Sequence, residues 1–244
     1  MAEFKIEIAG RVFAVHSLFD STRDYCRAYL SDKKAQYRIA VTRDHLQFEQ
    51  DFLRAEAIEE GIRIRTFTDP FLERAAIQRQ VADLLICHDT VLLHGSAVAV
   101  DGQGYLFAAK CGTGKSTHTR LWRQAFGQGA VMINDDKPFI RLSGSGAVIC
   151  GAPWSGKHGL DSNITVPLKG ICILERGAEN RVESIVPADA REMLHKQCSP
   201  PLDKALLPTH RELVEQLLAC TPLWRMECNK EIGAAITAHR AMSI

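Results

Sequence analysis

Apolar and polar side chains alternate along the first residues of the chain, with the period of two that half-buried β-strands show. Two such runs within residues 3–16 flank Ala9-Gly10 and predict an N-terminal hairpin. Apolar residues at helical spacing after Asp69-Pro70 predict a longer helix. The same patterns predict the other elements of this part: a helix at about 21–30 capped by Ser21 or Thr22, a strand at 37–41 and a helix at 42–57.

The pattern changes near residue 91, where short β-rich runs replace the helical spacing. Residues 91–100 and 105–109 are typical of strands joined by the turn Asp101-Gly102-Gln103-Gly104, and a helix is expected over 115–126. Further strands are predicted at 130–133, 138–142, 147–150, 170–174 and 223–227, with helices at 188–196, 209–218 and from Lys230. This alternation predicts an α/β fold, a mixed sheet flanked by helices with a smaller N-terminal α+β region, and divides the chain into residues 1–86 and 87–244.

Composition and charge argue against several classes of protein. Hydrophobic residues make up 46% of the 244 residues, which is ample for a buried core. The 30 basic and 29 acidic residues nearly cancel, so no nucleic-acid partner is expected. There is no signal-like start, no apolar run of the ~20 residues that span a bilayer, and no C-x-x-C pair among eight cysteines. We expect a cytoplasmic protein with reduced thiols and no membrane contact, and we leave open a homo-oligomer.

The segment 111–117 has the residue types of a loop that binds nucleotide phosphates. Glycines allow successive backbone N–H groups to turn towards an anion, and the helix that follows presents its positive end to the same charge. Lys115 supplies a cation for the outer phosphates, and the Ser116 hydroxyl reaches Mg²⁺. Ala109 stands where the usual pattern begins with glycine, so its backbone must avoid positive φ. We predict nucleotide binding by Cys111, Gly112, Thr113, Gly114, Lys115, Ser116 and Thr117.

Two acidic residues follow a short apolar strand downstream of this loop. Asp135 and Asp136 lie at the strand end, where one carboxylate can bind Mg²⁺ and the other can accept a proton from an attacking hydroxyl. The structural alternative is a turn, because Asn-Asp-Asp-Lys-Pro is also good turn chemistry. His94 begins another strand, and its position alone favours a structural histidine.

Residues 150–163, CGAPWSGKHGLDSN, form the next dense group of glycines and polar side chains. Trp154 can stack on a substrate, Ser155 offers a hydroxyl, and Lys157 offers a positive charge for an anionic substrate group or for the outer phosphates of the nucleotide. We predict that these residues bind the acceptor. The alternative is a connection between two strands with Trp154 in the core.

Together, these segments resemble the HPr kinase/phosphorylase group, P-loop proteins related to phosphoenolpyruvate carboxykinases. Members of the group show an His-Gly strand, a turn, a second strand, a G-x-G-K-S/T loop and a strand that ends in Asp-Asp. The chain has HGSAVAVDGQGYLFAAKCGTGKST and then VMINDD in the same order. The resemblance covers roughly residues 91–136, with weaker similarity to about residue 175.

The resemblance implies a P-loop core and roles for the matching residues. Lys115 and Ser116 would take the phosphate and metal roles, Asp135 and Asp136 would form the acidic pair, and His94 would lie near the transferred phosphoryl group. The chain lacks the long N-terminal domain and the arginine- and glycine-rich C-terminal signature of the bifunctional members, so phosphorolysis is not expected. It is similar to the shorter HPr-kinase-like proteins of bacteria, some of which are associated with phosphorylating a serine of a peptide or a small molecule.

The sequence therefore favours an ATP- and Mg²⁺-dependent kinase that acts on a hydroxyl group. Asp135 is the preferred base, with Asp136 close behind it and at the metal. The expected acceptor is a serine of a peptide or protein, or a small alcohol such as an amino acid or sugar. Two alternatives stay open: a carboxykinase-like enzyme acting on an oxaloacetate-type acid, and a non-catalytic nucleotide-binding regulator.

Overall fold

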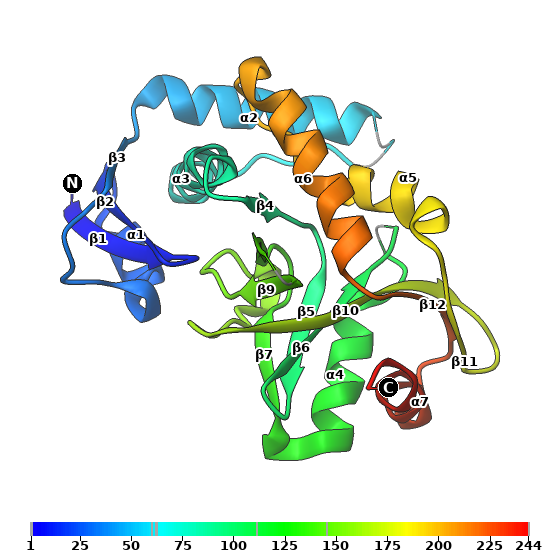
Figure 1. Cartoon of the computed structure of the whole chain (residues 1–244). Coiled ribbons are helices and arrows are strands. Elements are labelled where there is room, and N and C mark those ends of the chain that lie inside the picture. The colour runs from blue at the N-terminus through cyan, green and yellow to red at the C-terminus, as the bar shows by residue number, and fades with distance from the viewer. Residues whose placement is uncertain (1, 60, 62, 111, 145, 244) are drawn as a thin grey trace. The chain divides into compact units, whose positions relative to one another are not determined.

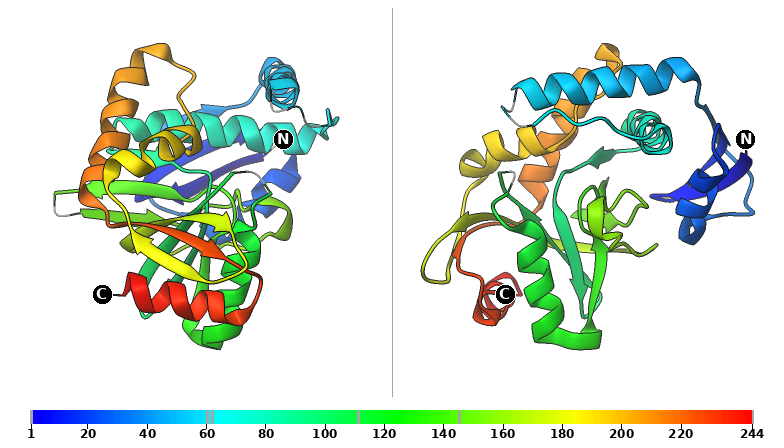
Figure 2. Two further views of the ribbon diagram at one scale, coloured as in Figure 1. Left: turned by 90° about the vertical axis from the view of Figure 1, so that its right-hand side faces the viewer. Right: turned by 180° about the vertical axis from the view of Figure 1, so that it is seen from behind.

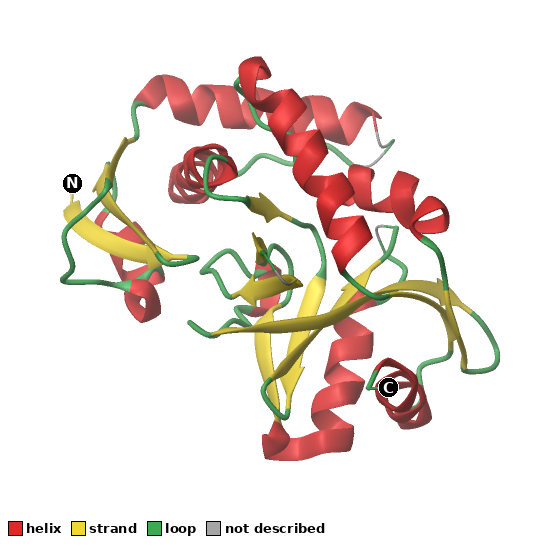
Figure 3. Cartoon of the chain, viewed as in Figure 1, coloured by secondary structure: helices red, strands yellow, loops and turns green. Residues whose placement is uncertain are grey.

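The computed structural model describes residues 2–59, 61, 63–110, 112–144 and 146–243 (Figure 1). The chain forms two compact units, Met1–Leu84 and Leu85–Ile244. Secondary structure is mixed α and β in each of them (Figure 3). Among the described residues, no helix is both long and apolar enough to cross a membrane.

The first unit contains a sheet in the order β1-β2-β3. β1 (Ala2–Ile8) and β2 (Arg11–Ser17) form the predicted hairpin, and β3 (Tyr37–Ala40) pairs with β2 in parallel. Alternation along the strands buries one face of this sheet, which presents Phe4, Ile6, Ile8, Phe13, Val15 and Ile39 to the core.

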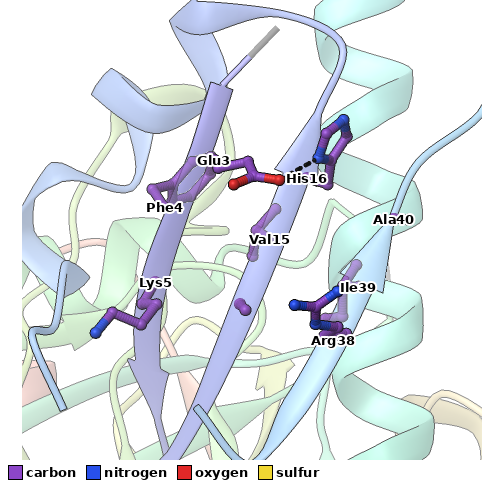
Figure 4. Close-up of a pocket in the computed structure, with 9 residues that line it drawn as sticks. Glu3, Phe4, Lys5, Val15, His16, Arg38, Ile39 and Ala40 are labelled. Carbon is purple, nitrogen blue, oxygen red and sulfur yellow. Dashed lines mark hydrogen bonds and ion pairs between the residues drawn. The ribbon is translucent and has the colours of Figure 1, made fainter. Parts of the chain in front are cut away.

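The opposite face of this sheet carries a hollow of about 450 Å³ (Figure 4). Polar side chains border it: Glu3 and Lys5 from β1, His16 from β2 and Arg38 from β3. His16 Nδ1 lies 2.9 Å from Glu3 Oε1. None of the residues that the sequence marks for catalysis or binding lines this hollow, so we assign it no part in the chemistry.

The helices of the first unit are α1 (Asp20–Tyr25), α2 (Arg43–Glu59) and α3 (Asp69–Ile86). The predicted cap of α1 is wrong, because the N-cap residue is Phe19 and no described side chain caps it. The Thr22 hydroxyl instead donates to Glu73, a fully buried carboxylate on α3. Because Thr22 and Glu73 are far apart in the sequence, no local pattern indicates that Thr22 contacts Glu73 instead of capping the helix.

The second unit is built on a mixed sheet in the order β4-β8-β9-β10-β6-β5-β7, with β12 beside β10 and β11 beside β12. β5 and β6 are antiparallel, whereas β6, β10 and β12 run parallel to one another. β10 pairs with β9 near its start and with β6 and β12 further along, so it connects both parts of the sheet. The strands are β4 (Thr90–Leu92), β5 (Ser96–Val100), β6 (Gln103–Ala108), β7 (Ala130–Asn134), β8 (Phe139–Ser143), β9 (Gly146–Cys150), β10 (Thr165–Arg176), β11 (Arg181–Ser184) and β12 (Leu223–Cys228).

Helices cover both faces of the β6–β10–β12 part of this sheet (Figure 2). α4 (Lys115–Phe126) and α7 (Ile232–Met242) pack on one face, and α5 (Pro187–Gln197) and α6 (Leu207–Cys220) pack on the other. β5 contributes apolar side chains to both sides of the core: Val98 and Val100 belong to the α4 side, and Ala97 and Ala99 belong to the α6 side. A strand buried on both faces therefore has a continuous apolar run.

His118 on α4 is a buried histidine that is neutral in the folded protein. Trp122 Nε1 donates to His118 Nε2 at 3.1 Å, and the Phe107 ring lies edge-on with its centroid 4.5 Å away. Burial lowers the pKa of His118 from 6.5 to about 4. The unfolded chain takes up this proton near its ordinary pKa, whereas the folded chain does so only near pH 4.

Stability should therefore fall as the pH drops from the ordinary histidine pKa towards 4. Between about pH 7.5 and pH 5, we expect His118 to account for a loss of roughly 2 kcal/mol in the free energy of unfolding. His118→Gln keeps an acceptor for Trp122 but cannot titrate, so its stability should depend less on pH by this amount. Urea unfolding of both proteins at each pH, with a chelator present, measures the difference in their free energies of unfolding. Equal pH dependence in both proteins would contradict the prediction.

Candidate active site

The segment between β6 and α4 forms a loop at the carboxyl end of a buried strand. After Ala108, it passes through Gly112 (φ +74°) and Gly114 (φ +124°), values that favour glycine, before α4 begins at Lys115. Ala109 is not among the described non-glycine residues with positive φ, as its Cβ requires. Gly114 is the N-cap of α4, and none of the described side chains caps it, so the first N–H groups of the helix can bind an anion.

Two cationic side chains hold this loop by its carbonyl groups. Arg176 Nη2 donates to the Gly112 carbonyl oxygen at 2.6 Å, and Lys115 Nζ donates to that of Ala109 at 3.4 Å. Arg176 ends β10, which runs parallel to β6, so the carboxyl ends of both strands meet at one edge of the sheet. No motif in the sequence marks Arg176, because only the pairing of β10 with β6 brings it to the loop.

Asp135 is a buried member of a hydrogen-bond network inside the fold. Its Oδ1 accepts a hydrogen bond from Ser96 Oγ at 2.7 Å, and the same hydroxyl lies 2.8 Å from Thr119 Oγ1. Ser96 begins β5 and Thr119 lies on α4, so Asp135 ties both elements to the end of β7. Only 7% of Asp135 is exposed, which is a confined position for the residue that the sequence favoured as the base.

Asp136 is partly exposed and lies beside His94. His94 Nε2 is 3.4 Å from Asp136 Oδ1, and the Gly95 N–H donates to the Asp136 carbonyl at 2.9 Å. Burial raises the pKa of the Asp136 carboxyl, and the charges of Lys137 and Lys115 oppose this rise. Burial, followed by Lys115 and Lys137, lowers the pKa of His94 from 6.5 to about 4, so its imidazole is neutral at neutral pH. A carboxyl group and a neutral imidazole therefore lie together within the field of Lys115.

The residues predicted to bind the acceptor differ in their exposure. Trp154 is buried, with its ring edge-on to Phe139 at a centroid distance of 6.3 Å. Ser155 is also buried, and its hydroxyl donates to Asp161 Oδ2 at 2.5 Å. Both positions favour the structural alternative for these two residues. Lys157 is exposed in a short 3-10 turn and stays available to a ligand.

Gly156 brings the same loop against Asp136. Its φ is +69°, and a Cβ at this position would lie 3.2 Å from Asp136 Cβ and 3.5 Å from its Cγ. The distance of 3.2 Å is tighter than most real Cβ contacts, so the loop backbone passes close to the side chain of Asp136. The sequence alone did not indicate this contact, because the fold brings Gly156 and Asp136 together.

The remaining predicted ligands belong to the glycine loop and the start of α4. Cys111 lies outside the described residues, Thr113 is half-buried, and Ser116 and Thr117 lie on the first turn of α4, with Ser116 exposed. The described part of the chain holds no cluster of three His, Cys, Asp or Glu side chains that could bind a metal ion alone. Mg²⁺ in phosphoryl-transfer sites needs few protein ligands, because substrate phosphates and water complete its shell. A hydroxyl and a carboxylate, as in Ser116 and Asp136, suit this chemistry.

Comparisons with known proteins add a distant likeness. No protein-family model matches the chain, and no curated protein matches it in sequence. Among solved structures, it is similar to the Hpr(Ser) kinase/phosphatase from Coxiella burnetii, with a TM-score of 0.36 and 8% sequence identity. The likeness covers 62% of this chain and 97% of that one. It is too remote to carry an argument about function.

Proposed function

We propose that this chain is a Mg²⁺-dependent kinase that transfers the γ-phosphoryl group of ATP to a hydroxyl group. The main support is geometric: Lys115 follows the glycine loop at the start of α4, and this helix is joined through Thr119 and Ser96 to Asp135, next to the pair of His94 and Asp136. Phosphoryl transfer to a hydroxyl needs a cation at the phosphates and a carboxylate for the proton. We infer an acceptor that is a serine of a peptide or protein, or a small alcohol such as an amino acid or sugar.

In this proposal, the glycine loop and α4 bind the outer phosphates of the nucleotide. The N–H groups of the loop and of the first helical turn surround phosphate oxygens, and Lys115 exchanges the Ala109 carbonyl for a phosphate. Ser116 offers its hydroxyl to Mg²⁺, which when bound neutralises charge on the phosphate oxygens. Arg176 keeps the loop in shape through the Gly112 carbonyl.

We assign the base to Asp136 and not to Asp135, which changes the preference drawn from the sequence. Asp135 is buried and one of its oxygens already accepts a hydrogen bond from Ser96. Asp136 is more accessible, and its raised pKa makes it a better proton acceptor. The neutral His94 beside it can donate from Nε2 and orient the carboxylate. Asp136 then takes the proton of the acceptor hydroxyl as that oxygen bonds to the γ-phosphorus, and the bond from this phosphorus to the bridging oxygen breaks to release ADP.

Incubation with γ-labelled ATP and Mg²⁺ tests this proposal directly. The panel of acceptors includes free amino acids, sugars, inositols and serine-containing peptides. We expect label on one class of hydroxyl compound, and no such label with Asp136→Asn. Nucleotide-dependent release of CO₂ from oxaloacetate would instead favour carboxykinase-like chemistry. Nucleotide binding without turnover on any acceptor would favour a regulator.

Gly156 provides a prediction about how closely Asp136 must be placed. Gly156→Ala adds a Cβ against Asp136, whereas Gly159→Ala adds one in the same loop with nothing within 4 Å. Both glycines have positive φ, +69° and +58°, so the backbone strain should cost about 1 kcal/mol in each variant. Only Gly156→Ala should also displace the carboxylate, and we expect about tenfold slower turnover from that displacement.

Matched measurements separate strain from contact in these two variants. Thermal unfolding should show similar losses of stability for both, and initial rates should differ between them. Equal rates in Gly156→Ala and Gly159→Ala would show that the position of Asp136 beside this loop has no bearing on turnover.

A further inference from the structure

The turn that contains Asp135 and Asp136 is called the acidic turn here. Asn134 uses both ends of its side-chain amide to join this turn to the 151–159 loop. Its Oδ1 accepts hydrogen bonds from the N–H groups of Asp136 at 2.8 Å and Lys137 at 2.6 Å. Its Nδ2 donates to the carbonyl oxygens of Ala152 at 2.7 Å and Trp154 at 3.3 Å. The side chain is fully buried, and these four bonds use the two acceptor sites and two donors that an amide has. The orientation of the amide is therefore fixed by its partners.

The backbone of Asn134 reinforces the same junction. Asn134 is the last residue of β7, where it pairs with Ala97 of β5. It also forms an isolated antiparallel bridge with Asp161, just beyond the loop. Asp161 in turn accepts the hydrogen bond from buried Ser155. Strand end, acidic turn and loop thus meet at one buried side chain.

We propose that Asn134 is a positioning residue for phosphoryl transfer, an inference that rests on the proposed function. Asn134 holds Asp136 and the 151–159 loop in one rigid arrangement, so that the base and Lys157, the residue of this loop that stays available to the acceptor, keep a fixed separation. It acts through Asp136 and needs no contact with nucleotide or acceptor. Buried and fully paired polar groups of this kind rigidify their surroundings.

Asn134→Asp removes one half of this junction and keeps the other. The new side chain has the same shape and can still accept from the two N–H groups of the acidic turn. It places an oxygen where the amide N–H₂ group faced the carbonyls of Ala152 and Trp154, and oxygen repels oxygen. We expect the 151–159 loop to separate from the turn while the turn itself persists.

The matched control is Asn229→Asp. Asn229 Oδ1 accepts from the Glu231 N–H at 3.0 Å, and its Nδ2 donates to the Ala178 carbonyl at 3.2 Å, just before α7. The same kind of double contact is therefore broken at a place with no proposed role in the reaction. We expect turnover, nucleotide affinity and amide exchange in residues 151–160 to match the wild type.

The experiment measures amide hydrogen exchange by mass spectrometry, the Kd for Mg-ATP by calorimetry, and kcat and KM on the full chain. For Asn134→Asp, we expect exchange over residues 151–160 to become about tenfold faster, because the bonds that restrain the loop are lost. The Kd and the KM for nucleotide should stay within about twofold, and kcat should fall about a hundredfold, because the base and loop are misaligned. A merely structural role would not lower kcat alone.

Two results would overturn the inference: unchanged exchange over residues 151–160, or faster exchange with a wild-type kcat. If Asn134→Asp does not fold, Asn134→Ser is measured with the same expectations, because a serine hydroxyl can still accept from the turn but cannot reach both sides. If the wild type shows no turnover, the proposed function fails. Faster exchange in the variant would then still support the coupling of turn and loop.

Discussion

Replacing Asp136 by asparagine is expected to lower the rate of phosphoryl transfer about a thousandfold, the range of general-base contributions. Asparagine has the shape of aspartate but cannot accept the proton of an acceptor hydroxyl. Nucleotide affinity should stay within about threefold, because in our proposal the loop and Lys115 supply most of the phosphate contacts. Single-turnover assays with γ-labelled ATP measure the rate, and calorimetry measures the affinity.

Asp135→Asn is the matched control for this substitution. Because Asp135 accepts a buried hydrogen bond from Ser96, its loss of charge should reduce the free energy of unfolding by about 2 kcal/mol. Turnover in the folded variant should fall less than about tenfold, far less than for Asp136→Asn. A larger loss of turnover in Asp135→Asn would return the role of base to Asp135. Recovery of Asp136→Asn at high Mg²⁺ would identify Asp136 as a metal ligand and not as the base.

Replacing Lys115 by methionine is expected to weaken binding of Mg-ATP about a hundredfold. Methionine keeps most of the length and the apolar stem of lysine but removes the proposed charge-assisted hydrogen bond to the phosphates, a contact of roughly 1.5–3 kcal/mol. Lys110→Met is the control, since Lys110 is exposed in the same loop and has no assigned role. Calorimetric titration of the three proteins compares their affinities. Equal weakening by both substitutions would indicate a general effect of charge and not a specific contact of Lys115.

Much of the fold could be predicted because its signals are local. The alternating runs around Ala9-Gly10 gave the hairpin of β1 and β2, and the helix expected over 115–126 is α4 (Lys115–Phe126). The pairing of strands that lie far apart in the sequence could not be predicted. The sequence indicated a β-rich run over 91–100 with a strand beginning at His94. The structure has two strands there: β4 pairs with β8, and β5, which begins at Ser96, pairs with β6 and β7. β10 is longer than the predicted 170–174 because β9 pairs with its first residues.

In the candidate site, too, the sequence indicated the local features but not the long-range contacts. Its glycines, lysine and paired acids lie in short segments, so the sequence alone marked Gly112, Lys115 and Asp136. The relative exposure of Asp135 and Asp136 depends on Ser96 and on the sheet around it, which no spacing reveals. The sequence indicated Asn134 only as part of a turn with Asp135 and Asp136. Its contacts with Ala152 and Trp154 had no local signal, because these residues lie in a loop that follows two further strands.

A crystal structure of the complex with Mg²⁺ and a non-hydrolysable ATP analogue tests the central claim most directly. We predict that the outer phosphates are bound by the N–H groups of residues 112–116 and by Lys115 Nζ. The terminal phosphate should face the Asp136 carboxylate, with room between them for a hydroxyl oxygen. Phosphates bound elsewhere on the chain, or an Asp136 carboxylate turned away from the terminal phosphate, would contradict the account.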